Sequence, residues 1–125
     1  MVISIKSYKQ LDVWNKGIDI VDKVYEFTKT FPKDEQYGLA SQMRRAAVSV
    51  PSNIAEGFSR GHTPEYIQFI KIALGSLAEL ETQFVIAQRR KYLNKRLSDG
   101  LADDIDHEGK MLMNLIKSLE KRRNS

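Results

Sequence analysis

Hydrophobic residues recur at spacings of three and four along most of the chain, which is the period of an α-helix with one buried face. Two such stripes run side by side between residues 11 and 31. The first consists of Leu11, Trp14, Ile18, Val21, Tyr25 and Thr28, and the second of Val13, Gly17, Ile20, Val24, Phe27 and Phe31. At about 100° per residue, the two stripes cover about half of the helix circumference. One bundle seam needs less than that, so the width indicates burial against a second copy of the chain.

A second helix follows the break at Pro32. Asp34 and Glu35 suit its first turn, because acidic side chains complement the positive end of the helix dipole. Its apolar stripe is Leu39, Met43, Ala47, Val50, Ile54 and Phe58. Gly57 and Gly61 mark its predicted end.

Two further helices complete the pattern. Thr63 is the predicted N-cap of the third, with Pro64 at its first position, and Asn94 is the predicted N-cap of the fourth. The third stripe is Tyr66, Phe69 or Ile70, Ala73, Leu77, Leu80 and Phe84, and the fourth is Leu97, Leu101, Ile105, Glu108, Leu112, Leu115 and Leu119. Four amphipathic helices with short connections predict an all-α fold, an up-down-up-down antiparallel four-helix bundle.

Pro51 lies inside the second predicted helix. A proline there removes one backbone hydrogen bond and leaves the carbonyl of Ala47 without its donor. The segment is therefore either two shorter helices or one helix with a proline kink. The apolar stripe keeps its phase through Pro51, which favours the kink, with Ser49, Ser52 or Asn53 helping to satisfy the freed carbonyl.

A polar cluster surrounds this proline and consists of Ser49, Pro51, Ser52, Asn53 and Glu56. Asn53 and Glu56 lie three residues apart, so their side chains are neighbours on a helix. They form either a hydrogen-bonded pair at the surface or between subunits, or part of a buried network that fixes the helix register. Both alternatives are structural, and we favour them over a catalytic role.

The chain of 125 residues predicts a single domain over residues 1–125. Ser7 and Gln10 form a predicted capping box ahead of Leu11. Residues 1–6 are expected to form an N-terminal arm, and residues 122–125 a frayed tail. No apolar stretch reaches the roughly 20 residues of a membrane span, and no signal peptide is recognisable, so we expect a cytoplasmic protein.

The residues that could carry chemistry are few. The chain has no cysteine and two histidines, His62 and His107. Asp104 and His107 form one carboxylate–histidine pair, whereas a di-iron bundle needs such a pair on each of two helices and two further glutamates. We therefore predict no metal, no cofactor and no enzymatic activity.

Positive charge gathers at one end of the predicted bundle. The net charge is +4, and antiparallel helices bring the start of the first and third helices beside the end of the second and fourth. The candidate nucleic-acid-binding residues at this end are Arg60, His62, Lys71, Lys117, Lys121, Arg122 and Arg123, with Lys6 and Lys9 nearby.

The opposite end differs, because acidic residues there offset much of the positive charge. These residues are Asp34, Glu35, Asp99, Asp103 and Asp104. A basic end attracts phosphate backbones without reading sequence. An alternative explanation needs no ligand. Basic residues at the end of the fourth helix complement the negative end of its dipole, which accounts for the same concentration of positive charge.

Several segments resemble the bacterial family of 23S rRNA intervening-sequence proteins: LDVWNKGIDIV, FPKDEQYGLASQMRRAAVSVPSNIAEG, GSLAELETQ and GKMLMNLIKSLEK. The similarity spans roughly residues 7 to 121, and the block Val50–Gly57 is its most specific part. The resemblance implies a four-helix bundle that assembles into a homopentamer. It also implies kinship with accessory subunits of diversity-generating retroelements, which engage a reverse transcriptase and nucleic acid.

Two functions are consistent with these features. The first is a non-catalytic homo-oligomeric adaptor with nonspecific affinity for RNA or DNA through the basic end. The second is a protein–protein interaction scaffold that binds no nucleic acid.

Overall fold

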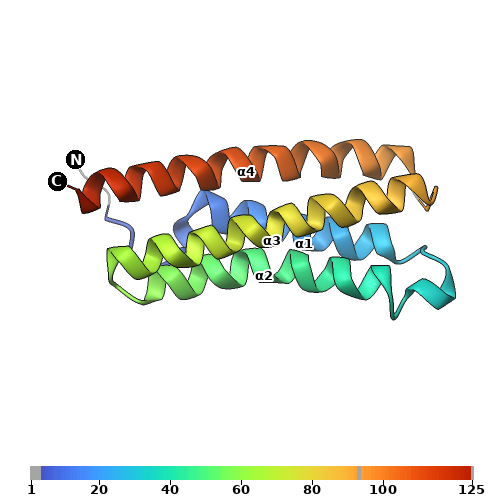
Figure 1. Cartoon of the computed structure of the whole chain (residues 1–125), viewed down its shortest axis with the longest axis horizontal. Coiled ribbons are helices and arrows are strands. Elements are labelled where there is room, and N and C mark those ends of the chain that lie inside the picture. Colours follow the sequence, from blue (N-terminus) through green and yellow to red (C-terminus); the bar gives the residue numbers. More distant parts are fainter. Residues whose placement is uncertain (1–3, 93, 125) are drawn as a thin grey trace.

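The structure, a computed structural model, describes residues 4–92 and 94–124 and contains four long helices in that part of the chain (Figure 1). They are α1 (Asp12–Thr28), α2 (Leu39–Ser59), α3 (Thr63–Arg89) and α4 (Lys95–Arg123). Two short 3-10 helices precede α1 and α2, namely η1 (Tyr8–Gln10) and η2 (Lys33–Glu35). The predicted antiparallel four-helix bundle is confirmed.

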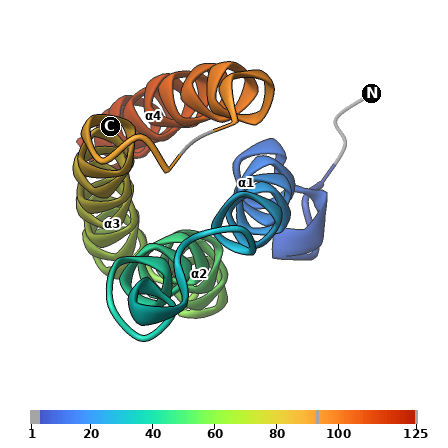
Figure 2. The same cartoon turned by 90° about the vertical axis from the view of Figure 1, so that its right-hand side faces the viewer.

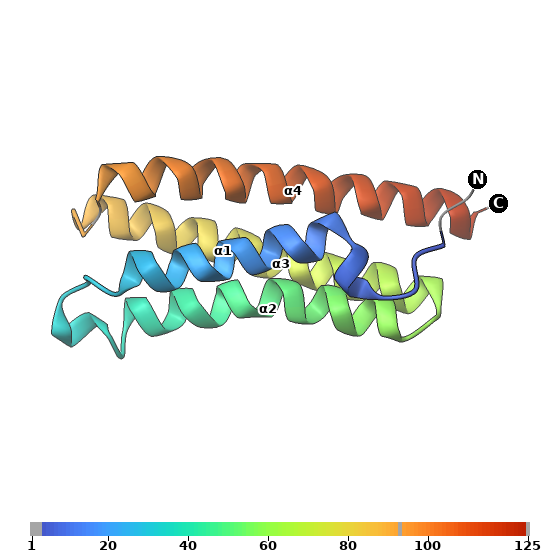
Figure 3. The ribbon, with the colours of Figure 1, turned by 180° about the vertical axis from the view of Figure 1, so that it is seen from behind.

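The helices follow one another around the bundle in chain order, as the view along its length shows (Figure 2). The N-terminal segment, the α2–α3 turn and the end of α4 lie at one end of the bundle, and the α1–α2 and α3–α4 connections lie at the other (Figure 3). The topology therefore brings together the chain segments that carry the predicted basic end. No helix in the described ranges is long and apolar enough to cross a membrane.

One hydrophobic core fills the space between the four helices. The apolar stripes supply most of it, and its largest fully buried apolar side chains are Ile20, Met43, Ile54, Ile70, Leu80, Leu101 and Leu112. Leu97, the first residue of the predicted stripe in α4, is 41% exposed and does not belong to the core. Ile70 rather than Phe69 belongs to the core stripe of α3, since Ile70 is fully buried and Phe69 is only half-buried. Close packing of such side chains is the main stabilising contribution in a bundle of this kind.

In α1 the second stripe forms the core, while the first stripe, apart from the buried Thr28, is only partly covered. Trp14, Ile18 and Val21 are half-buried. Tyr25 is 48% exposed, so this position of the first stripe lies outside the core. Tyr25 instead lies under the guanidinium group of Arg44, which holds the ring at the surface. The wide apolar arc predicted for this helix thus leaves a partly exposed apolar surface on the chain.

Three predicted helix starts differ from the structure. The capping box of Ser7 and Gln10 is present, but it caps η1, and α1 begins one turn later at Asp12. Asp34 and Glu35 belong to η2, and α2 begins at Leu39 after Gly38, whose φ of −107° and ψ of −110° break the helical path. The N-cap of α3 is His62.

Helix α2 runs without interruption through Pro51, as its apolar phase predicts. The alternative of two separate helices is wrong, whereas the bend expected at Pro51 stays a prediction. Gly57 does not end α2, because the helix continues to Ser59, and a side chain at Gly57 would collide with α3. Gly61 does mark the end, with the φ of +65° that glycine adopts readily. Helix α4 extends through Arg122 and Arg123, two residues of the predicted tail.

Candidate nucleic-acid interface

The basic end combines side chains from three helices. Arg60 follows the last residue of α2, His62 is the N-cap of α3, and Lys71 lies two turns into α3. Helix α4 supplies the other four residues, Lys117, Lys121, Arg122 and Arg123. All seven side chains are exposed. The α2–α3 turn and the end of α4 lie at the same end of the bundle (Figure 1), so the sequence-predicted residues share one region of the molecule.

A hollow of about 520 Å³ lies among these segments. His62 and Arg122 line it together with Ser4, Thr63 and Ser118, and its apolar wall includes Phe58, Tyr66, Leu115 and Leu119. Burial raises the pKa of the Tyr66 hydroxyl, and the positive charge of Arg122 partly opposes that effect. The hollow therefore combines one arginine, Arg122, with an aromatic wall, and cations beside aromatic rings are found where single-stranded nucleic acids bind.

Lys71 and Arg60 of the basic end form ion pairs. Lys71 Nζ lies 3.4 Å from Glu120 Oε1, and Arg60 Nη2 lies 3.0 Å from Glu56 Oε1. The guanidinium carbon of Arg60 also lies 5.1 Å from the centroid of the Phe69 ring. Both ion pairs are exposed, so each is worth at most about 1 kcal/mol and can open to a phosphate.

Lys117 faces a different part of the surface from His62 and Arg122. It lines a groove of about 650 Å³ between α3 and α4, whose apolar lining includes Leu74, Leu77, Ile105 and Met113. Asp106, Lys110 and Glu81 also line this groove. The structure thus separates Lys117 from the hollow, although it keeps the residue on the same helix end.

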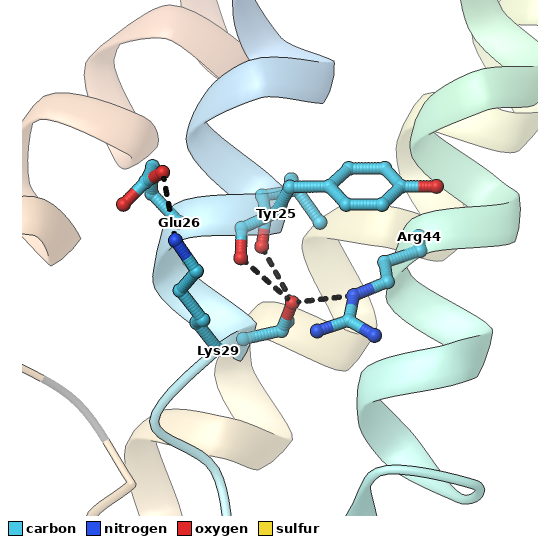
Figure 4. Close-up of polar contacts among 6 residues, drawn as sticks. Tyr25, Glu26, Lys29 and Arg44 are labelled. Atoms are coloured by element: carbon cyan, nitrogen blue, oxygen red, sulfur yellow. Dashed lines mark hydrogen bonds and ion pairs between the residues drawn. The ribbon is translucent and has the colours of Figure 1, made fainter.

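At the opposite end of the bundle, Arg44 is held by neighbouring groups. Its Nε donates to Thr28 Oγ1 at 2.9 Å and its Nη2 donates to Gln36 Oε1 at 3.3 Å. The close-up shows its guanidinium group beside Tyr25, while Glu26 and Lys29 pair on the other side of α1 (Figure 4). Arg44 therefore ties α1 to α2.

Asp104 does not offset the cations at the opposite end, which corrects the charge assignment made from the sequence. Its side chain is buried between α1 and α4, where Oδ1 lies 2.7 Å from Lys16 Nζ and Oδ2 pairs with Lys23 Nζ. Burial works against the ionised form, but the two lysines outweigh it and lower the pKa of the Asp104 carboxyl. The sequence showed no sign of this role, because Asp104 and its partners lie far apart in the chain.

The polar cluster around Pro51 divides into separate contacts. Asn53 Nδ2 donates to the Ser49 carbonyl at 2.8 Å and to Ser49 Oγ at 2.9 Å, and Ser49 Oγ lies 2.8 Å from Ser76 Oγ of α3. Pro51 leaves the carbonyl of Ala47 without its helical donor, whereas Asn53 donates to the carbonyl of Ser49, two residues later. Glu56 pairs with Arg60, and Ser52 is exposed and lines a hollow between α1 and α2. The half-buried contacts among Ser49, Asn53 and Ser76 link α2 to α3.

Glu108 is the buried acid of the core stripe in α4. Its side chain is 0% exposed, and neither carboxyl oxygen has a hydrogen-bond partner within the described ranges. Burial raises the pKa of its carboxyl to about 8, with a smaller opposing effect of Lys16. The sequence could predict that Glu108 is buried, because the residue lies on an apolar stripe. The stripe by itself indicates no function for the acid.

The described residues contain no group of three or more His, Cys, Asp and Glu side chains that could hold a metal ion. Asp104 faces the lysines of α1, whereas His107 is exposed. The carboxylate–histidine pair considered from the sequence is therefore divided between the core and the surface.

Comparison with known proteins gives a family and a fold. The family model described as "23S rRNA-intervening sequence protein" matches residues 9–114. A crystal structure of a protein of unknown function from the S23 ribosomal protein family of Bacteroides thetaiotaomicron VPI-5482 has the same fold, with a TM-score of 0.77 and 21% sequence identity over 84% of this chain and 95% of that one. No match is found among curated proteins. The chain belongs to the family of 23S rRNA-intervening sequence proteins.

Proposed function

We propose that this protein is a non-catalytic homo-oligomeric adaptor that binds RNA without sequence preference through its basic end. The observation that carries the proposal is the convergence of exposed cations from α2, α3 and α4 at one end of the bundle. Cations that neutralise phosphates release counterions, which gives affinity for any RNA backbone. A reverse transcriptase and nucleic acid are the partners that the family resemblance implies.

The half-covered stripe of α1 supports self-association. Trp14, Ile18 and Val21 line a hollow of about 280 Å³ with Pro51 and Val48 of α2, and Val48 is 41% exposed. Apolar surface of this kind is commonly buried between subunits. In a closed ring the basic end would be repeated around the axis, and its attraction for phosphate would increase. Five subunits is the number that the family resemblance implies.

Fluorescence polarisation with labelled duplex RNA tests the basic end. The test variant reverses Lys117, Lys121, Arg122 and Arg123 to Glu, and the matched control reverses Arg89, Arg90, Lys91 and Lys95 at the opposite end. We expect the test variant to bind much more weakly. Its affinity should also depend less steeply on salt, with a slope reduced by about 0.7–0.9 for each phosphate that the protein no longer neutralises. Equal RNA affinity for the test variant and the wild-type protein at every salt concentration would refute this site.

A protein-interaction scaffold without nucleic-acid binding is the second candidate. The groove of about 650 Å³ between α3 and α4 favours it, since its lining includes the apolar side chains of Leu74, Leu77 and Met113. Apolar grooves between helices accept amphipathic helices of partner proteins. Wild-type protein that binds no duplex RNA at low salt would favour this candidate over the adaptor.

A further inference from the structure

Glu108 and Pro51 occupy the same junction between α1, α2 and α4. A methyl group built at Gly17 of α1 would lie 3.2 Å from Glu108 Oε2 and 3.3 Å from Pro51 Cβ. Gly17 thus provides the space in which a carboxyl group from α4 and a proline ring from α2 both contact α1. Two features that are costly in isolation, a proline inside a helix and an acid in a core, meet at this point.

The surroundings of Glu108 favour its neutral form. The side chain is fully buried and neither oxygen has a partner within the described ranges, so an ionised carboxylate there would lose its hydration without compensation. Lys16 of α1 is the charged group that acts on it, and Lys16 is already paired with Asp104 at 2.7 Å. Lys23 is likewise paired with Asp104, and Asp19 acts on Lys16. No titratable group of α2 or α3 contributes among the described residues.

A neutral acid is also the form that this junction tolerates. Neither Glu108 oxygen has a hydrogen-bond partner within the described ranges. Ionisation would therefore place an uncompensated charge beside Gly17 of α1.

We propose that Glu108 is a pH-sensitive latch, which holds α1 against α2 and α4 as a neutral acid and loosens this junction when it loses its proton. The free-energy cost of ionisation is relieved when water reaches the carboxylate, and this requires the packing around Gly17, where α1 meets Glu108 and Pro51, to open. Burial raises the pKa of Glu108 to about 8, so the neutral form predominates at neutral pH. Mildly alkaline conditions would release the latch.

Two signals test this proposal on the full-length protein. The carboxyl carbon of Glu108, identified in ¹³C-glutamate NMR spectra by its absence from Glu108→Gln, should titrate with a midpoint near 8. Trp14 is the only tryptophan of the chain and lines a hollow with Pro51, so its fluorescence reports on the α1–α2 seam. Its emission should shift with the same midpoint in the wild-type protein and stay constant over that range in Glu108→Gln.

A second variant keeps the test decisive if Glu108→Gln does not fold. Lys16→Gln removes the charge that favours ionisation, so it should move the NMR midpoint to higher pH, while Lys23 still pairs with Asp104. The proposal would be overturned by a Glu108 midpoint near the ordinary value of 4.5. It would also be overturned by a Trp14 emission that follows the same pH curve in the wild-type protein and in Glu108→Gln.

Discussion

Gly57 of α2 and Phe69 of α3 approach so closely that a methyl group at Gly57 would lie 2.6 Å from Phe69 Cβ. Real Cβ atoms do not come this close, so the two helix backbones depend on the absence of a side chain at Gly57. The same methyl group would lie 3.3 Å from the backbone oxygen of Tyr66, which leaves little room for adjustment.

We predict that Gly57→Ala destabilises the protein by about 1–3 kcal/mol, because the added methyl group forces α2 and α3 apart. Gly75→Ala is the matched control, since Gly75 lies in α3 with nothing within 4 Å of the added methyl group. This control should stabilise the helix by about 0.5–1 kcal/mol. Urea denaturation of both variants measures the difference, and equal effects would contradict the proposed close approach.

The contact between Ser49 and Ser76 should couple α2 to α3. Their hydroxyl oxygens lie 2.8 Å apart, and Ser49 Oγ also accepts from Asn53, so the Ser49 hydroxyl is free to donate to Ser76. Ser76→Ala should cost about 0.5–1.5 kcal/mol of unfolding free energy. In a double-mutant cycle with Ser49→Ala, the two losses should not add. Strict additivity would show that the hydroxyl contact contributes nothing.

The sequence could predict those features that depend on local periodicity. The phase of the apolar stripe carries α2 through Pro51, and the same periodicity places Glu108 on the buried face of α4. The features it could not predict depend on contacts between helices. The sequence suggests that Gly57 ends a helix, whereas in the structure it allows the close approach of α3. The sequence likewise suggests that Asp104 is a surface acid, whereas in the structure it pairs with Lys16 and Lys23 of α1.

The candidate site likewise has a part that topology predicts and a part that depends on contacts between helices. Antiparallel topology alone predicts that the α2–α3 turn and the end of α4 lie together, as Figure 1 shows. The sequence could not predict that His62 and Arg122 share a hollow while Lys117 lines the α3–α4 groove, since the direction of each side chain depends on helix rotation.

The buried acid predicts a specific dependence of stability on pH. The folded pKa of Glu108, about 8, lies above its ordinary value of 4.5. The folded state therefore binds this proton more tightly than the unfolded state does. Stability from this group is full below 4.5 and is lost progressively as the pH rises towards 8. Thermal melts should show this loss in the wild-type protein and a much smaller one in Glu108→Gln, and parallel curves would contradict the assignment.

Asp104 predicts the opposite behaviour in acid. Lys16 and Lys23 lower its folded pKa below the ordinary 3.8, so its contribution is present above that value and is lost as the pH falls through the folded pKa. Asp104→Asn should cost about 1–2 kcal/mol at neutral pH, because both lysines reach solvent and the pairs are only partly buried. The variant should also lose less stability than the wild-type protein on acidification, and chemical denaturation at a series of pH values measures both effects.

Self-association through the half-covered stripe of α1 is the central claim, since the adaptor function depends on it. Multi-angle light scattering of the wild-type protein should give about five times the chain mass of 14.4 kDa. Val48→Lys should reduce this mass because it places a charge on the exposed apolar surface, whereas the similarly shaped Val48→Thr should keep most of the assembly. A wild-type mass of 14.4 kDa at micromolar concentration would contradict the account.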